Sequence, residues 1–165
     1  MKKTRKLTYI ALLTALSTIS VMFLRVPNGV GGIIHPGDSI IYITAIFFGP
    51  LAGAFVGGIG HSLANLLSDT AVWAPWTFAI KGIMGSVVGL IAHNAVQIKN
   101  ARLWIALIIS TAILIVGYFI AGIFVLGAGA AVAQAVMTSI QGVIGIIVTI
   151  VLLPIVNKIL GGRKL

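Results

Sequence analysis

The stretch FGPLAGAFVGGIGHSLANLLSD, from Phe48 to Asp69, is too apolar for a solvated loop and too rich in glycine for an ordinary soluble helix. Small and polar residues recur in it at intervals of four, at Gly49, Gly53, Gly57, His61 and Asn65. Residues four apart are neighbours on a helix, so these positions form one slowly drifting stripe. What His61 and Asn65 do on this stripe depends on what surrounds the helix.

The composition of the chain places this helix in a membrane. Of the 165 residues, 59% are hydrophobic and only 8% are charged, which is too little charge for the surface of a soluble domain. The formal net charge of +9 would suggest nucleic acid binding on a soluble fold, but the basic residues lie at the chain ends and in one short loop. The absence of cysteine excludes disulfides, thiolate catalysis and thiolate metal sites.

We expect an all-α fold in which residues 1–165 form a single transmembrane domain, a bundle of six transmembrane helices. A spanning helix needs about 20 mostly apolar residues, fewer where protein shields it, and the basic N-terminus leads into a retained first span rather than a cleaved signal peptide. The expected helices are Leu7–Leu24, Ser39–Phe48, Leu51–Leu67, Thr77–Val96, Leu103–Leu126 and Ala133–Ile159.

The second and third segments have an alternative interpretation as one long kinked helix over residues 37–67. The Gly49-Pro50 pair interrupts helical hydrogen bonding, however, and the two pieces together exceed one bilayer crossing. These observations favour a tight cytoplasmic turn at Gly49-Pro50.

The distribution of basic residues predicts the orientation of the bundle. If the chain has six spans, nine of the eleven lysine and arginine residues fall on the same side of the membrane. Five spans would divide these nine residues between the two sides. Arg25 lies on the opposite side and Lys81 within a span. Basic residues favour the cytoplasmic side, so both termini are predicted to be cytoplasmic. The nine residues are Lys2, Lys3, Arg5, Lys6, Lys99, Arg102, Lys158, Arg163 and Lys164.

Polar residues gather in the predicted outer half of the bundle. Polar groups at membrane depth normally face the protein interior or a water-filled cavity, which makes His61 and Asn65 functional candidates, whereas the glycines of their stripe are explained by close helix packing. The other candidates for a substrate-binding cavity are Asp38, Trp73, Trp76, Lys81, Gln134, Thr138 and Gln141.

Each of these candidates also has a structural interpretation. The tryptophans suit an interfacial aromatic belt, Asp38 and Lys81 suit a buried ion pair, and the Gln134, Thr138 and Gln141 face suits hydrogen bonds between helices. A similar series at intervals of four comprises Lys81, Gly85, Gly89 and His93. His93 falls near the cytoplasmic interface, so it is not placed in the site.

No catalytic or cofactor-binding pattern is present in the sequence. Two acidic residues near opposite edges of a loop do not make a hydrolase pair, and three histidines without a helical pair or a carboxylate ligand do not predict a metal site. No GxxxxGK[ST] sequence for nucleotide phosphates occurs, so we expect that this chain does not handle ATP and that, if it transports anything uphill, the energy comes from a partner. We expect no cofactor, no metal and no nucleic acid partner.

Three segments resemble the substrate-binding S components of energy-coupling factor (ECF) transporters, which take up vitamins across the prokaryotic cell membrane. They are FGPLAGAFVGGIGHSLANLL, in the position of a G-P-x-x-G-x-x-x-G segment, FAIKGIMGSVVGLIAH, and IALLTALS in the first helix. The resemblance covers nearly the whole chain. It implies that Ala11 and Ala15 form an A-x-x-x-A motif that docks on a transmembrane coupling subunit, and that two separate ATPase subunits hydrolyse ATP.

Within that family the sequence is most similar to the type assigned to hydroxymethylpyrimidine or pyridoxine. Tryptophan can stack on a flat ring, and histidine, asparagine and glutamine offer directional hydrogen bonds without net charge. Riboflavin or another vitamin is the alternative ligand. Two other classes stay open: a structural or regulatory membrane subunit that transports nothing, and a self-sufficient secondary carrier, for which the sequence offers few intramembrane acids.

Overall fold

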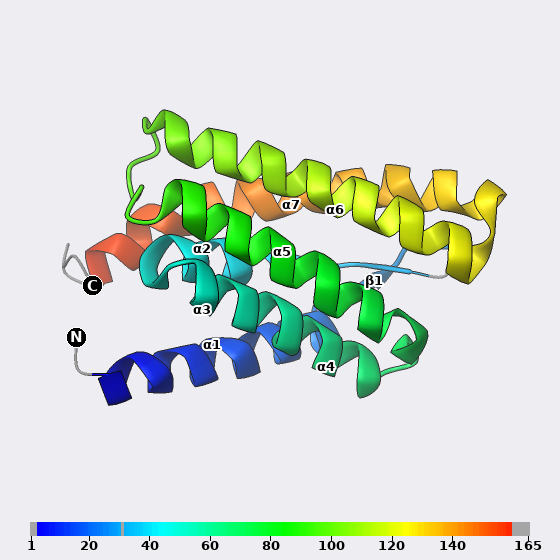
Figure 1. The fold of residues 1–165 in the computed structure, drawn as a ribbon, viewed down its shortest axis with the longest axis horizontal. Helices are drawn as coiled ribbons and strands as arrows, with labels where there is room; N and C mark the ends of the chain where they lie inside the picture. Colours follow the sequence, from blue (N-terminus) through cyan, green and yellow to red (C-terminus); the bar gives the residue numbers. More distant parts are fainter. Residues whose placement is uncertain (1–2, 31, 160–165) are drawn as a thin grey trace.

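The computed structural model describes residues 3–30 and 32–159 as a bundle of helices that run along one common axis (Figure 1). The helices are α1 (Lys3–Phe23), α2 (Asp38–Phe48), α3 (Pro50–Phe55), η1 (Val56–Gly60), α4 (His61–Leu66), η2 (Ala71–Trp73), α5 (Ala74–Ala92), α6 (Ala101–Leu126) and α7 (Ala128–Ile159). Since α3, η1 and α4 follow one another without a break, the described residues form six main helical segments, as the sequence predicts.

Among the described residues, four helices are long and apolar enough to cross a membrane by length and composition: α1, α5, α6 and α7. The other two segments are shorter. Helix α2 has 11 residues, which is about 16 Å of helix and less than a full hydrocarbon core. The six membrane crossings and the orientation of the bundle therefore remain predictions. Three of the nine basic residues that predict the orientation lie outside the described residues: Lys2, Arg163 and Lys164.

The ends of the segments alternate between the two ends of the bundle. Helix α1 begins, and α7 ends, at the same end as the α2–α3 turn and the loop between α5 and α6 (Figure 1). The α2–α3 turn occurs at Gly49, whose positive φ of 89° favours glycine. The α4–α5 connection and the α6–α7 turn lie at the opposite end. This alternation agrees with the tight turn predicted at Gly49-Pro50.

The all-α prediction misses one feature, a small hairpin at the end opposite the Gly49 turn. Strands β1 (Val26–Pro27) and β2 (Ile33–Ile34) pair antiparallel between α1 and α2. Two-residue strands are too short to show alternation in the sequence. The predicted helix boundaries are also late at several starts. In particular α5 begins at Ala74 rather than Thr77, so Trp76 lies in the helix and not in the loop before it.

The glycine stripe packs against α5. A Cβ added at Gly53 would lie 2.6 Å from the carbonyl oxygen of Gly85, and one at Gly57 would collide with the carbonyl of Lys81. Gly89 faces the backbone of Pro50 in the same way. The four-residue series of the two helices thus face each other in antiparallel order, and small residues let the backbones touch.

A π-helical turn, η1, precedes His61 in this packed segment. Such turns are rare and occur often at functional sites, because the extra residue changes the direction of the side chains that follow. Here the glycine-packed half of the segment ends at η1, and His61 and Asn65 follow it on α4, both buried.

Candidate functional site

A narrow cavity lies among α1, the hairpin, α4, η2, α5, α6 and α7. The centres of water molecules can occupy about 30 Å³ of it, which is room for about two waters. Six predicted site residues from three elements meet at its wall: His61 and Asn65 of α4, Trp73 of η2, and Gln134, Thr138 and Gln141 of α7. The structure therefore brings together side chains that are far apart in the sequence.

Asp38 and Lys81 do not line the cavity but form a fully buried ion pair behind it. The Lys81 Nζ atom lies 2.5 Å from Asp38 Oδ1, and both side chains are 0% exposed. Gln141 Nε2 donates to the other carboxylate oxygen at 2.9 Å. The ammonium also lies 5.5 Å from the centre of the Tyr118 ring. A buried charge needs such partners, so this pair carries no net charge to the cavity.

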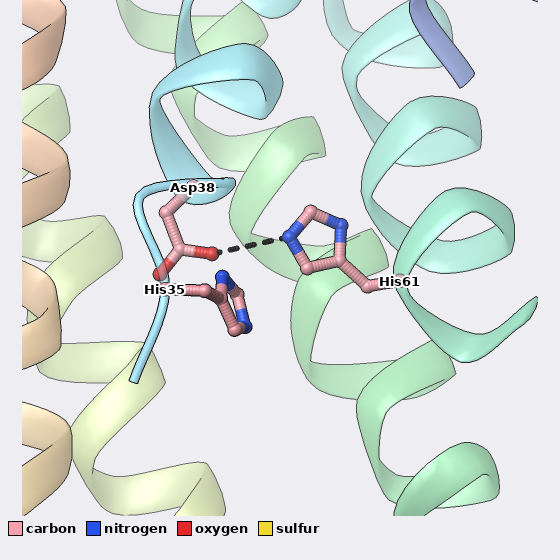
Figure 2. Close-up of side chains that lie close together, drawn as sticks. All are labelled: His35, Asp38 and His61. Atoms are coloured by element: carbon pink, nitrogen blue, oxygen red, sulfur yellow. Dashed lines mark ion pairs between the residues drawn. The ribbon is translucent and has the colours of Figure 1, made fainter. Parts of the chain in front are cut away.

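His61 connects this ion pair to α1. Its Nε2 atom lies 3.5 Å from Asp38 Oδ1 (Figure 2), and its Nδ1 atom lies 3.0 Å from Ser17 Oγ. Thr18 of α1 donates to the carbonyl of Gly60, directly before His61, at 2.9 Å. These contacts fix the position of the imidazole against the cavity from two sides.

A second polar network crosses the cavity wall from α4 to α6. Asn65 Nδ2 donates to Thr77 Oγ1 at 2.7 Å, and Thr77 Oγ1 lies 2.8 Å from the hydroxyl of Tyr118. Thr70 Oγ1 donates to Asn65 Oδ1 at 3.3 Å. Because both ends of the Asn65 amide are engaged, its first role in this structure is to hold α4, α5 and α6 in register.

The two predicted tryptophans occupy different environments. Trp73 is buried, lines the cavity and lies 5.8 Å from the Tyr118 ring, centre to centre, so the two rings form an aromatic wall. Trp76 instead stacks on Phe124 of α6, with ring centres 5.5 Å apart, and is not among the cavity residues. Trp73 ends η2 and Trp76 lies in the first turn of α5, and the two side chains contact different parts of α6, at Tyr118 and at Phe124.

The hairpin covers the cavity and is tied to α7. Asn28 Oδ1 accepts from the backbone N–H groups of Val30 and Gly32 at 3.0 and 2.9 Å, while Asn28 Nδ2 donates to Gln134 Oε1 at 2.7 Å. Asparagine thus closes its own turn and holds the turn against Gln134. The structural interpretation of Gln134 was a hydrogen bond between two helices. The observed hydrogen bond instead joins helix α7 to the hairpin.

An exposed ion pair links two other segments at the same end of the bundle. Arg25, after α1, donates to Asp69, after α4, at 2.6 Å. This hydrogen bond and the positive charge of Arg25 lower the pKa of Asp69 below its ordinary value. The link therefore persists into mildly acidic solution.

The remaining predicted residues lie away from the cavity. His93 lies beside the Gly49 turn, with its Nε2 atom 3.7 Å from the position of a Cβ on Gly49. Ala11 and Ala15 are exposed on α1. They line a shallow apolar groove together with Leu7, Ile10, Thr14, Thr18, Phe55 and Leu63.

Sequence reasoning missed several cavity residues, of which His35 is the most informative. It lies in HPGDS, the segment that supplied Asp38, and it is 5% exposed. Burial lowers the pKa of His35 well below its ordinary value, although Asp38 opposes this shift. Tyr118 and Thr77 of the cavity, and Asn28 beside Gln134, were missed because each is a single polar residue in an apolar or turn segment, without a repeat that marks it.

The expectation that no carboxylate accompanies the histidines is wrong. His35, Asp38 and His61 each offer a ligand atom, and these atoms lie within 4.8 Å of one another. Whether a cation suits this cluster depends on the charge around it, which includes Lys81.

Comparison with known proteins gives a family for this arrangement. The family model described as "ECF-type riboflavin transporter, S component" matches residues 1–158. A protein of Pyrococcus woesei, described only as an uncharacterized protein in a gap 3' region, is 32% identical over 132 residues, which are 79% of this chain and 87% of that protein. The thiamine precursor transporter HmpT of Lactococcus lactis subsp. cremoris (strain MG1363) is 27% identical over 159 residues, 95% of this chain and 90% of that protein.

Proposed function

Because the chain belongs to the S-component family of ECF-type transporters, a family of membrane transport subunits, we propose that it binds a small neutral vitamin precursor in the cavity beside His61. Hydroxymethylpyrimidine or pyridoxine is the favoured ligand, and uptake across the prokaryotic cell membrane is driven by ATP. The observation that carries the proposal is the cavity itself, in which polar side chains and an aromatic wall enclose a space without net charge.

The choice of a one-ring ligand rests on chemistry and on size. Trp73 and Tyr118 offer faces for a flat ring, and the histidines, Thr138 and Gln141 offer hydrogen bonds. The similarity to a thiamine precursor transporter supports the pyrimidine. The cavity is smaller than any vitamin in this closed arrangement, so the hairpin and the α4–α5 connection must move apart to admit the ligand.

Riboflavin is the second candidate, and the description of the family favours it. A tricyclic flavin with a ribityl chain needs far more room than a single ring. The closed cavity, held at one side by the Asn28–Gln134 hydrogen bond, has to open for either ligand, and the single ring requires the smaller opening.

We assign the coupling surface to the groove at Ala11 and Ala15. Small exposed residues one turn apart let another helix approach closely in lipid, and large apolar side chains border them, including Leu7, Phe55 and Leu63. The partner is the transmembrane coupling subunit of an ECF complex, and two ATPase subunits supply the energy. The chain itself performs no catalysis.

Uptake measurements test this proposal. Cells or vesicles that contain the complete coupling module should take up labelled hydroxymethylpyrimidine only when this chain and ATP are both present. Uptake by this chain alone, driven by an ion gradient and indifferent to ATP, would establish a secondary carrier. A chain that neither binds nor transports any compound of a broad vitamin panel is a structural or regulatory subunit, and the proposal fails.

A further inference from the structure

Two buried ring nitrogens at the cavity lack a hydrogen-bond partner among the described residues. They are His35 Nδ1 and His61 Nε2. The two side chains are only 5% and 1% exposed, and both histidines line the cavity. Figure 2 shows both rings beside the Asp38 carboxylate, His35 from the loop before α2 and His61 from α4. An unpaired buried polar atom is costly, so a pair of them facing one cavity points to a ligand.

The two nitrogens are close enough to be bridged by one atom. One ligand atom from each of His35, His61 and Asp38 lies within 4.8 Å of the others, a separation that one oxygen at about 2.8 Å from each ring nitrogen can bridge. Gly37 permits this approach, because a Cβ there would lie 3.1 Å from His35 Nδ1 and 3.0 Å from His61 Nε2. The bridging group is thus a hydroxyl, a water or a metal ion.

The charges around the pair decide against the metal ion. Asp38 already receives Lys81 on Oδ1 at 2.5 Å and Gln141 on Oδ2 at 2.9 Å. A divalent cation would therefore share one carboxylate with a buried ammonium and add charge that no other acidic residue in the described chain compensates at this depth.

A hydroxyl group satisfies the pair without adding charge. Each neutral imidazole has one N–H donor and one acceptor nitrogen. Asp38 Oδ1, 3.5 Å from His61 Nε2, favours the proton on that nitrogen, and Ser17 lies against the other. His61 then donates to the bridging oxygen, and His35 Nδ1 accepts the hydroxyl proton.

We propose that His35 and His61 together bind the hydroxyl of a hydroxymethyl group on a neutral heterocyclic ligand, and that His35 is a specificity-determining residue. This inference rests on the proposed function and adds the group on the ligand that is recognised. A methyl group in the same place leaves both nitrogens unpaired. A phosphate ester brings negative charge towards Asp38, so the pair selects the free alcohol over its phosphorylated form.

The test compares ligands that differ only in this hydroxyl. Isothermal titration of the purified full chain in detergent measures the affinities for hydroxymethylpyrimidine and for its methyl analogue, which has hydrogen in place of the hydroxyl. We expect the wild-type chain to bind the alcohol at least about 10-fold more tightly, the size of one or two hydrogen bonds in a buried site. Pyridoxine and its 4-deoxy analogue form a second ligand pair.

Variants then assign the preference to the histidines. His35→Phe keeps the size of the ring and removes its nitrogens, so the preference for the alcohol should fall to within about 2-fold. His93→Phe makes the same change beside the Gly49 turn, away from the cavity, and should keep the wild-type preference. Thermal unfolding shows whether each variant is folded. The comparison of the alcohol and methyl ligands on the wild-type chain tests the proposal even if a variant does not fold.

Four results overturn the inference. Equal binding of the alcohol and methyl ligands by the wild-type chain removes the hydroxyl contact but leaves the proposed function intact. If folded His35→Phe still prefers the alcohol as strongly as the wild-type chain does, His35 does not contact the hydroxyl. Binding of Co²⁺ alone, with a tetrahedral absorption spectrum that His35→Phe abolishes, makes the pair a metal site. Failure of both ligand pairs to bind rejects the proposed substrate class as well.

Discussion

At His61, a single side chain joins three parts of the molecule: Ser17 of α1, Asp38 of α2 and the cavity. If it makes a buried hydrogen bond to the ligand, His61→Ala should weaken ligand binding by roughly 1 to 3 kcal/mol. The matched control is His93→Ala, which should leave binding nearly unchanged because His93 lies beside Gly49. Fluorescence titration, with Trp73 in the cavity wall as reporter, measures both. Normal binding by a folded His61→Ala chain removes His61 from the site.

The buried pair of Asp38 and Lys81 makes a prediction about stability. Lys81→Met should destabilise the fold by about 3 to 5 kcal/mol, because it leaves the Asp38 carboxylate buried without its ammonium. Adding Asp38→Asn should recover much of this loss, since the second change removes the uncompensated charge. Thermal unfolding in detergent gives the comparison. If the double variant is no more stable than Lys81→Met alone, the charge is not the cause.

The residue types of the site were partly predictable and their contacts were not. Intramembrane polarity marks His61, Asn65 and Lys81, because such residues are rare in spanning helices. His35 lies in the same short segment as Asp38 but outside any helical repeat, so nothing in the sequence indicates that it faces His61. The Asn28–Gln134 hydrogen bond joins positions 106 apart in sequence, and only the three-dimensional fold brings them together.

At the scale of elements, the glycine contacts between α3, η1 and α5 explain the opening sequence pattern. Gly85→Ala should lower the melting temperature strongly, because the added Cβ meets the backbone of Gly53. Gly129→Ala is the control, since a Cβ at Gly129 meets nothing within 4 Å and alanine is the better helix former. Equal melting temperatures for the two variants would mean that α3 and α5 are not packed through their glycines.

Helix existence and order followed from hydrophobic length, whereas helix ends and the short elements did not. The turn at Gly49 was predictable because glycine and proline together interrupt a helix. The hairpin between α1 and α2 was not, since its strands have two residues each. The π-helical turn before His61 could not be predicted for another reason. It lies in a run of small residues that can adopt either an α-helical or a π-helical turn.

At the scale of the whole molecule, the proposed sites of ligand binding and of coupling lie in different places. The cavity lies towards the hairpin end of the bundle, and Ala11 and Ala15 lie on the exterior of α1. Ala11→Trp or Ala15→Trp should therefore abolish ATP-dependent uptake by the complete complex, while the isolated chain still binds its ligand, because a bulky side chain holds the partner helix away. Leu12→Trp, on the neighbouring exposed face of α1, is the control and should transport normally. Normal transport by the Ala11→Trp, Ala15→Trp double variant would exclude this face as the coupling surface.

Native mass spectrometry of the gently solubilised chain tests the central claim, that the cavity binds a small neutral vitamin precursor, most directly. After incubation with a panel of free vitamins and precursors, we predict one added mass that corresponds to hydroxymethylpyrimidine or pyridoxine, and its loss in the His61→Ala variant but not in His93→Ala. An added mass that survives His61→Ala would place the ligand elsewhere. If the wild-type chain carries no compound from the panel, the proposed binding of a vitamin precursor in the cavity is contradicted.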